Sequence, residues 1–209
     1  MSESAAATPT RVAIVTFDGF NELDSFIALG LLNRLRPQGF TAEIVGPSTR
    51  LRSMNGVTID ARQPLEYANE ADVVLFGSGI HTRALAESAA LVGRFALDPT
   101  RQLIGAQCSG TLLLARLGLL GDMPACTDLT TKPWAEQAGV HVVNAPFYAR
   151  GPVATAGGCL ASQYLATWVM LKRAGLHATE QALRYAAPVG EKDEYVAKLV
   201  GVVRPFLAE

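Results

Sequence analysis

The residues best suited to covalent chemistry lie in QLIGAQCSGTLLLARLGLL, at residues 102–120. An apolar run leads into AQCSG (residues 106–110), and a helical pattern follows directly, which is the order of a nucleophile elbow. The small side chains of Ala106 and Gly110 suit the close backbone approach of such a turn. A thiol at a helix N-terminus has a lowered pKa, so we expect Cys108 to be a reactive nucleophile. The alternative is a buried cysteine that serves only as a small hydrophobic residue.

Three carboxylates follow the first apolar run of the chain, in FDGFNELD at residues 17–24. Asp18, Glu22 and Asp24 are expected near the carboxyl end of the first strand, where one of them could face the thiol. Acidic residues in a first helical turn also stabilise the helix, and Asn21 has the type and position of an N-cap. Local sequence therefore leaves two interpretations open, catalysis and helix capping.

Two glycine-containing turns could bring backbone N–H groups to the carboxyl end of the sheet, close to Cys108. Gly77, Ser78 and Gly79 follow the run DVVLF and could bind an anionic oxygen, although the same residues could form a simple turn. They lack both the dinucleotide-binding fingerprint and the lysine of a P-loop. Gly157 and Gly158 indicate a close backbone approach, which could lie beside the pocket.

The other cysteines and the histidines show no ligand pattern. Cys126 and Cys159 lack the surroundings of an elbow, so we expect both to be buried thiols. Three cysteines at wide spacings fit neither a disulfide framework nor a CxxC site. Since His81, His141 and His177 are not clustered either, we expect no metal and no cofactor.

The elements that position these residues follow from the hydrophobic pattern. Nearly continuous apolar runs predict strands buried on both faces of a parallel sheet, at residues 11–17, 41–45, 72–76, 102–106 and 140–143. Apolar residues spaced by three and four predict helices at residues 23–35, 82–96, 109–119, 159–174 and 192–207. This alternation predicts a doubly wound α/β domain, in which functional groups gather where strands end and helices begin.

Two local patterns refine this prediction. The first helix has a stripe that is expected to face the sheet, formed by Leu23, Phe26, Ile27, Gly30, Leu31, Arg34 and Leu35. Residues 51–60 contain Asn55 and Gly56 between extended segments, which predicts a β-hairpin.

Composition limits the classes of partner. The chain has 209 residues, 49% of them hydrophobic, with 18 Lys and Arg against 19 Asp and Glu, a net charge of −1. This balance offers no attractive field for nucleic acid or for a membrane surface, so we expect a small-molecule partner. Residues 1–10 are small and polar and lack the features of a secretory signal, which predicts a flexible leader and a cytoplasmic location. The length of the chain predicts a single domain at residues 11–209.

Taken together, the motifs resemble the DJ-1/PfpI superfamily over about residues 11–185. The resemblance is carried by RVAIVTFDGFNELD, ADVVLFGSG, GAQCSGTLLLARLGLL and VATAGGCLASQYLATWVM. It implies a flavodoxin-like three-layer sandwich with a mostly parallel central sheet, and commonly a homodimer. It also implies a reactive cysteine at Cys108 with a carboxyl group beside it, which falls on Asp24.

Among the branches of the superfamily, the chain is most similar to isocyanide hydratases. These proteins share a G-x-x-x-L-D pattern, which corresponds to Gly19–Asp24 in this chain. They also have a hydroxyl residue after the cysteine, which corresponds to Ser109.

Two positions depart from the superfamily. Asp128 stands where a histidine is frequent, which disfavours peptide hydrolysis, and FGSG at residues 76–79 stands where Pro-Gly-Gly is common.

We therefore expect a cofactor-free enzyme in which Cys108 adds to a small electrophile, with Asp24 transferring protons and Ser109 assisting. The first choice of reaction is hydration of an isocyanide to an N-substituted formamide. The alternatives are a 2-oxoaldehyde enzyme of the glyoxalase or deglycase type, and a non-enzymatic redox-sensing or stress-protective protein that uses the same cysteine. The balanced charge disfavours a DNA-binding regulator.

Overall fold

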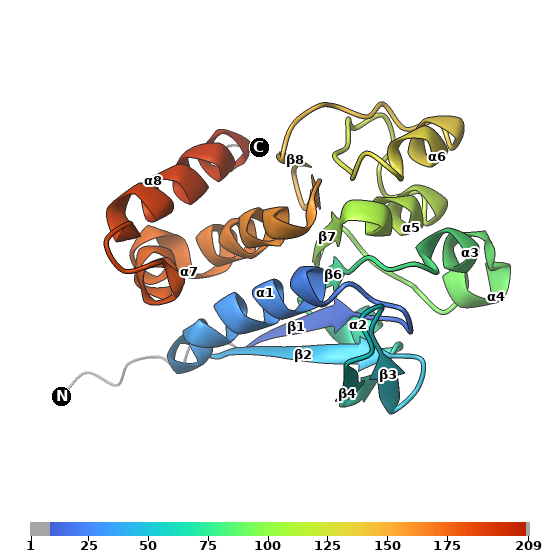
Figure 1. Cartoon of the computed structure of the whole chain (residues 1–209), viewed down its shortest axis with the longest axis horizontal. Coiled ribbons are helices and arrows are strands. Elements are labelled where there is room, and N and C mark those ends of the chain that lie inside the picture. Colours follow the sequence, from blue (N-terminus) through green and yellow to red (C-terminus); the bar gives the residue numbers. More distant parts are fainter. Residues whose placement is uncertain (1–8, 208–209) are drawn as a thin grey trace.

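The computed structural model describes residues 9–207 and is built around one seven-stranded sheet, in the order β5-β2-β1-β6-β7-β9-β8 (Figure 1). Neighbouring strands from β5 to β9 are parallel, whereas β8 pairs antiparallel with β9. The sheet strands are β1 (Thr10–Val15), β2 (Phe40–Gly46), β5 (Gln63–Pro64), β6 (Val73–Phe76), β7 (Leu103–Gln107), β8 (Phe147–Arg150) and β9 (Val153–Ala156). The predicted α/β fold with a mostly parallel sheet is confirmed.

Both faces of the sheet are covered, which explains the continuous apolar runs. Along β1, Val12 and Ile14 belong to one hydrophobic cluster, and Ala13 and Val15 belong to the cluster on the opposite face. The helices that pack on the first face are α1 (Glu22–Leu32), α7 (Ser162–Ala186) and α8 (Lys192–Val203). The helices on the second face are α2 (Tyr67–Glu70), α3 (Thr82–Glu87), α4 (Ala89–Val92), α5 (Thr111–Arg116) and α6 (Lys132–Gln137).

Short 3₁₀ segments adjoin several helices. They are η1 (Asn33–Gln38), η2 (Cys108–Gly110), η3 (Cys159–Ala161) and η4 (Arg204–Phe206). Within residues 9–207, no helix has the length and apolar character that crossing a bilayer requires. The predicted leader at residues 1–10 falls mainly on residues 1–8, outside the described part, and Thr10 already belongs to β1.

The fifth predicted strand is wrong. Of residues 140–143, only Val142 makes a bridge, an isolated one with Ala125, and His141 is exposed. The last parallel strand is β9, whose four residues are all buried and which is paired through a tight turn with β8. The segment VATA of β9 is short and half alanine. Its hydrophobic pattern is therefore weaker than that of residues 140–143, which contain three valines but are more exposed.

The predicted helices exist but have different limits. Residues 82–96 form two short helices, because Ser88 is extended and its side chain caps α4. The helix predicted at 159–174 continues to Ala186, with a break at Gly175, where φ is 77°. The helix predicted at 192–207 ends at Val203 and continues as η4.

The predicted stripe of the first helix is confirmed only in part. Leu31 and Leu35 are buried and Phe26 and Ile27 pack against the core, whereas Leu23 is 47% exposed. The buried face of α1 also includes Ser25, Ala28 and Leu32. Small residues at positions 25 and 28 let α1 lie close to the sheet and to α7, which leaves the larger Phe26 only partly buried.

The predicted hairpin is confirmed. β3 (Arg50–Arg52) pairs antiparallel with β4 (Thr58–Asp60), and the turn between them contains Gly56 with a φ of 89°. This two-stranded hairpin, called the β3–β4 hairpin below, projects beyond the carboxyl ends of β1 and β2 (Figure 1).

Candidate active site

Cys108 lies where β7 ends and the segment leading to α5 begins, so the predicted elbow is confirmed. Among residues 9–207 it is the one non-glycine residue with a positive φ, 47°. The turn is tight: a Cβ at Gly110 would lie 2.7 Å from Gly77 O and 2.8 Å from Phe76 O, so this position requires glycine. The strained conformation directs the Cys108 thiol across the carboxyl edge of the sheet, toward the loop before α1.

Neighbouring loops hold this turn. Thr127 Oγ1 donates to Cys108 O at 2.8 Å, and the Gln107 amide donates to Gly158 O at 2.7 Å while lying 3.7 Å from Cys108 Sγ. The backbone N–H of Gly158 also hydrogen-bonds to the Cys108 thiol and lowers its pKa. The loop after β9 is therefore fixed against the elbow.

Asp24 is the carboxylate that reaches the thiol. It is 2% exposed, and a carboxylate oxygen of Asp24 and the sulfur atoms of Cys108 and Cys159 all lie within 4.8 Å of one another. Ser78 Oγ donates to Asp24 Oδ2, and Ser162 Oγ donates to Asp24 O at 2.8 Å. Ser78 thus holds the carboxylate of Asp24 beside Cys108, and Ser162 holds its backbone.

Helix capping does not account for Asp24. Asn21 is the N-cap, since its side chain accepts from Leu23 N at 3.1 Å, but the Asn21 N–H donates to Ser78 O and not back to Asp24. Asn21 has a second contact, because its Nδ2 donates to Cys159 Sγ at 3.0 Å.

The other two candidate carboxylates point elsewhere. Asp18 Oδ1 accepts from Arg52 N at 2.8 Å, and Glu22 accepts from Ser53 Oγ and, at 2.8 Å, from Asn55 Nδ2. Both therefore attach the β3–β4 hairpin to the start of α1 and leave Asp24 as the acid of the site.

Burial controls the proton distribution between Asp24 and Cys108. It raises the pKa of Asp24 from 3.8 to about 6, against the opposing effect of hydrogen bonds from Ser78 and Cys108. Burial and the charge of ionised Asp24 raise the pKa of Cys108, so the expected lowering of this pKa by the helix N-terminus is wrong. Asp24 therefore loses its proton at a lower pH than Cys108 does, and near neutral pH the pair consists of a carboxylate and a thiol.

The turn at residues 77–79 mainly serves this acid. The backbone N–H and the hydroxyl of Ser78 both hydrogen-bond to the Asp24 carboxylate, and the Gly77 N–H donates to Val15 O at 3.0 Å. Gly79 borders the cavity in front of Cys108. Of the three residues proposed to bind an anionic oxygen, Ser78 and Gly79 line the cavity, and Ser78 is already hydrogen-bonded to Asp24.

Gly157 makes the close backbone approach that its sequence indicates. A Cβ there would lie 2.4 Å from the backbone oxygen of Thr127, the residue whose side chain also holds the elbow. Gly158, with a φ of 89°, brings its N–H to the thiol.

A cavity of about 430 Å³ opens in front of Cys108. Its apolar part is formed by Met54, Ile80 and Trp134, and Ser109 and Asp128 add polar groups. The full lining consists of Asn21, Met54, Ser78, Gly79, Ile80, Arg83, Cys108, Ser109, Asp128, Thr130, Thr131, Trp134 and Cys159. The three histidines all belong to the described residues, and none of them lines this cavity.

Asp128, which the resemblance places at the position of a frequent histidine, lines the cavity. Its Oδ1 accepts from Thr130 N and Thr131 N, both at 2.9 Å, in the turn before α6. Its charge raises the pKa of both Asp24 and Cys108. The site therefore contains acidic groups around a thiol and no imidazole within the cavity lining.

The other two cysteines differ from each other. Cys126 is fully buried, as predicted, and burial raises its pKa to about 12. The prediction that Cys159 is also buried is wrong, because it is partly exposed and lines the cavity with Cys108. The close approach implied by Gly157 and Gly158 was the signal in the sequence that could have placed the next residue at the pocket.

An α/β sandwich with a strained cysteine at a strand–helix turn and a buried acid beside it defines the class of protein. The chain belongs to the DJ-1/PfpI family, whose sequence profile matches residues 10–175. No curated protein matches the chain significantly.

Solved structures show the same fold at low identity. A ThiJ/PfpI family protein from Pseudomonas syringae has a TM-score of 0.78 and 17% identity, over 97% of this chain and 91% of that chain. Drosophila melanogaster DJ-1beta has a TM-score of 0.75 and 18% identity, over 86% and 98%. An AraC family transcriptional regulator from Pseudomonas putida has a TM-score of 0.69 and 18% identity, over 86% and 100%.

Proposed function

We propose that the chain is a cysteine-dependent enzyme that hydrates a small electrophile, with an isocyanide as substrate and an N-substituted formamide as product. One observation carries the proposal: the Asp24 carboxylate, buried and with a pKa raised to about 6, lies directly beside the Cys108 thiol. When a thiol is paired with a carboxylate base, its sulfur and its proton can both be transferred to the same carbon atom. The terminal carbon of an isocyanide can form both of these bonds.

In the first step, the Cys108 sulfur bonds to the terminal carbon of the isocyanide. Asp24 takes the proton of the thiol and delivers it to the same carbon, which gives a thioimidate and restores the carboxylate. The carboxylate oxygen and the sulfur lie within 4.8 Å of each other, so the proton can pass between them after a small movement or through one water molecule.

In the second step, water adds to the thioimidate carbon. Asp24 takes a proton from the water and the nitrogen of the thioimidate receives one, which gives a tetrahedral intermediate. The C–S bond then breaks, the hydroxyl proton returns to the Cys108 sulfur by way of Asp24, and the formamide leaves. Ser109 and the backbone of Gly79 line the cavity and are the groups proposed to orient the water and the developing oxygen.

The shape of the cavity supports a small substrate with an apolar substituent. Its volume of about 430 Å³ suits a small molecule, and Met54, Ile80 and Trp134 offer apolar contacts at its mouth. Peptide hydrolysis is disfavoured because no imidazole lies in the cavity to protonate an amine leaving group.

The decisive experiment offers a panel of isocyanides and 2-oxoaldehydes to the wild-type protein and to Cys108→Ala. We expect the wild type to form formamides from isocyanides and Cys108→Ala to form none. Formation of 2-hydroxy acids instead would support the alternative 2-oxoaldehyde activity. Product formation that is equal in both proteins would refute a role of the cysteine.

The resemblance to the family also leads us to propose a cytoplasmic homodimer. An apolar groove of about 790 Å³ runs between α1 and the connection from α7 to α8, and it includes Phe26, Leu160 and Tyr185. Leu160 and Tyr185 are 64% and 70% exposed, and a second copy would cover them in a two-fold contact. We expect sedimentation as a dimer, and as a monomer after Tyr185→Glu, whereas Leu176→Glu, outside the groove, leaves the dimer intact.

A further inference from the structure

Two cysteines and one carboxylate meet in the cavity. The sulfur atoms of Cys108 and Cys159 and a carboxylate oxygen of Asp24 all lie within 4.8 Å of one another, and both cysteines line the same cavity. The proposed hydration uses only Cys108 and Asp24. Cys159 is therefore a nucleophilic group beside the reacting thiol that the hydration leaves without a role.

The surroundings of Cys159 hold its sulfur at the elbow. Asn21 Nδ2 donates to Cys159 Sγ at 3.0 Å, and this bond ties η3 to the start of α1. Directly before it, Gly158 donates its backbone N–H to the Cys108 thiol, so the backbone that carries Cys159 already lies against the elbow. To form a disulfide, the two sulfur atoms must move from within 4.8 Å to bonding distance.

We propose that Cys108 and Cys159 form a redox-active dithiol, which a hydroperoxide oxidises to a disulfide and a small dithiol reduces again. The proposal does not depend on the identity of the hydrated substrate. It assigns Cys159 the role of a resolving cysteine, which condenses with an oxidised Cys108.

Asp24 takes part in the first of two stages. The Cys108 sulfur attacks one oxygen of the hydroperoxide, the O–O bond breaks, and Asp24 moves the thiol proton to the departing alkoxide or hydroxide. Cys108 is then a sulfenic acid. The Cys159 sulfur attacks the Cys108 sulfur, the S–O bond breaks, and the thiol proton of Cys159 leaves with the hydroxyl group as water. Two thiols supply the two electrons that reduce the hydroperoxide.

The disulfide has two consequences. It occupies the sulfur that the proposed hydration requires, so the oxidised protein is inactive until it is reduced. It also competes with a second oxidation of Cys108, because a thiol within 4.8 Å reacts before a further hydroperoxide molecule arrives. Oxidation therefore stops at a reversible stage.

Trypsin separates the three cysteines, which makes a direct test available. Cleavage after Lys and Arg, except before proline as at Lys132, places Cys108 on residues 102–116, Cys126 on residues 117–150 and Cys159 on residues 151–172. The full-length protein is treated with hydrogen peroxide, blocked with an alkylating agent and mapped by mass spectrometry without reduction. We expect a cross-linked pair of peptides 102–116 and 151–172, lighter than their sum by two hydrogens, which dithiothreitol separates.

Matched serine variants complete the test. In Cys159→Ser, peptide 102–116 should gain two oxygens at least about tenfold faster than in the wild type, and dithiothreitol should not remove them. Cys126→Ser should form the same cross-link as the wild type. A wild-type protein without the cross-link, in which Cys108 gains two oxygens as fast as in Cys159→Ser, would overturn the proposal. If Cys159→Ser does not fold, as judged by circular dichroism, the wild-type peptide map alone decides.

Discussion

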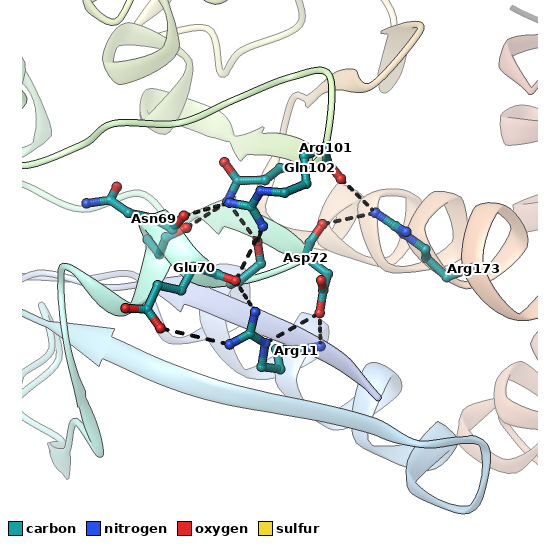
Figure 2. Close-up of polar contacts among 9 residues, drawn as sticks. Arg11, Asn69, Glu70, Asp72, Arg101, Gln102 and Arg173 are labelled. Carbon is teal, nitrogen blue, oxygen red and sulfur yellow. Dashed lines mark hydrogen bonds and ion pairs between the residues drawn. The ribbon is translucent and has the colours of Figure 1, made fainter. Parts of the chain in front are cut away.

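The two ends of the central sheet use polar residues in opposite ways. At the amino ends of β1, β6 and β7, charged side chains form a network (Figure 2). The Arg11 guanidinium lies 3.6 Å from Asp72 Oδ2, which also accepts from the Arg11 backbone N–H at 2.8 Å. The guanidinium groups of Arg101 and Arg173 donate to backbone carbonyls, Arg101 to Asn69 O at 2.6 Å and Arg173 to Asp72 O at 3.2 Å. Each guanidinium therefore has an acceptor near the surface.

At the carboxyl ends of the same strands, polar atoms are buried and incompletely paired. Asp24 Oδ1 and Gln107 Oε1 are buried without a nitrogen or oxygen partner, and both residues adjoin Cys108. Paired polar groups thus stabilise one end of the sheet, whereas the other end keeps an incompletely paired acid beside a thiol at some cost in stability.

The largest effect is expected from the elbow itself. Cys108→Ala removes the nucleophile, so turnover should fall by about 10⁴-fold or more, while the small buried alanine keeps the fold. The measurement is initial velocity on the best substrate of the panel, with circular dichroism as the folding control. Cys126→Ser, at a buried cysteine outside the cavity lining, is the matched control and should keep its activity.

Asp24→Asn should separate reactivity from stability. The amide can donate a hydrogen bond but cannot cycle a proton, so we expect turnover to fall by about 10²–10⁴-fold. The wild-type kcat/KM should decrease as the pH falls through about 6, because Asp24 must be ionised to act as a base. Near-wild-type turnover in the Asp24→Asn variant would refute the proposed role.

The stability of the same variant should change in the opposite direction. The pKa of Asp24 is raised from 3.8 to about 6, so the folded protein binds this proton more tightly than the unfolded chain. Stability is therefore lost as the pH rises from about 4 to about 6. Asp24→Asn should raise the free energy of unfolding at pH 7.5 by up to about 3 kcal/mol, and denaturant titrations at pH 4 and pH 7.5 check this.

The histidines should matter little. Since none of them lines the cavity, replacing His81, His141 or His177 by Gln should leave turnover within about tenfold of the wild type. Kinetic measurements on the three single variants check this expectation. A loss of about a thousandfold in any one of them would indicate a thiol–imidazole pair and contradict the mechanism.

The smallest effect is expected at the opposite end of the sheet. Asp72→Asn weakens the contacts with Arg11 but keeps an oxygen that can accept from its backbone N–H. We expect the free energy of unfolding to fall by about 1 kcal/mol or less and turnover to stay unchanged, because these groups are partly exposed. A large loss of turnover here would show that the two ends are coupled.

Sequence patterns predicted the parts of the fold that depend on strong local signals. Four parallel strands, the hairpin turn at Asn55 and Gly56 and the elbow at Cys108 are all present. The strand β9 was missed because two of its four residues are alanine, and the split between α3 and α4 was missed because it depends on the conformation of one serine, Ser88. Such features depend on tertiary packing more than on local propensity.

The same limit applies to the site. Asp24 was distinguished from Glu22 only by resemblance to a family, since both occupy the first turn of one helix. Ser78 contacts Asp24, which lies 54 positions earlier in the chain, and Cys159 contacts Asn21, which lies 138 positions earlier. No local sequence pattern encodes contacts over such separations. The direction of the pKa shift of Cys108 was wrong because burial and the charge of Asp24 oppose the helix N-terminus.

The attachment of the β3–β4 hairpin has a consequence for how this protein can diversify. The hairpin places Met54 at the mouth of the cavity, and Glu22 and Asp18 bind it from outside the pair of Asp24 and Cys108. Under the proposed function, a change in the length or sequence of the hairpin would alter which molecules enter the cavity, while Asp24 and Cys108 keep their own contacts. We therefore expect exchange of residues 50–60 to change the range of substrates more than the reaction.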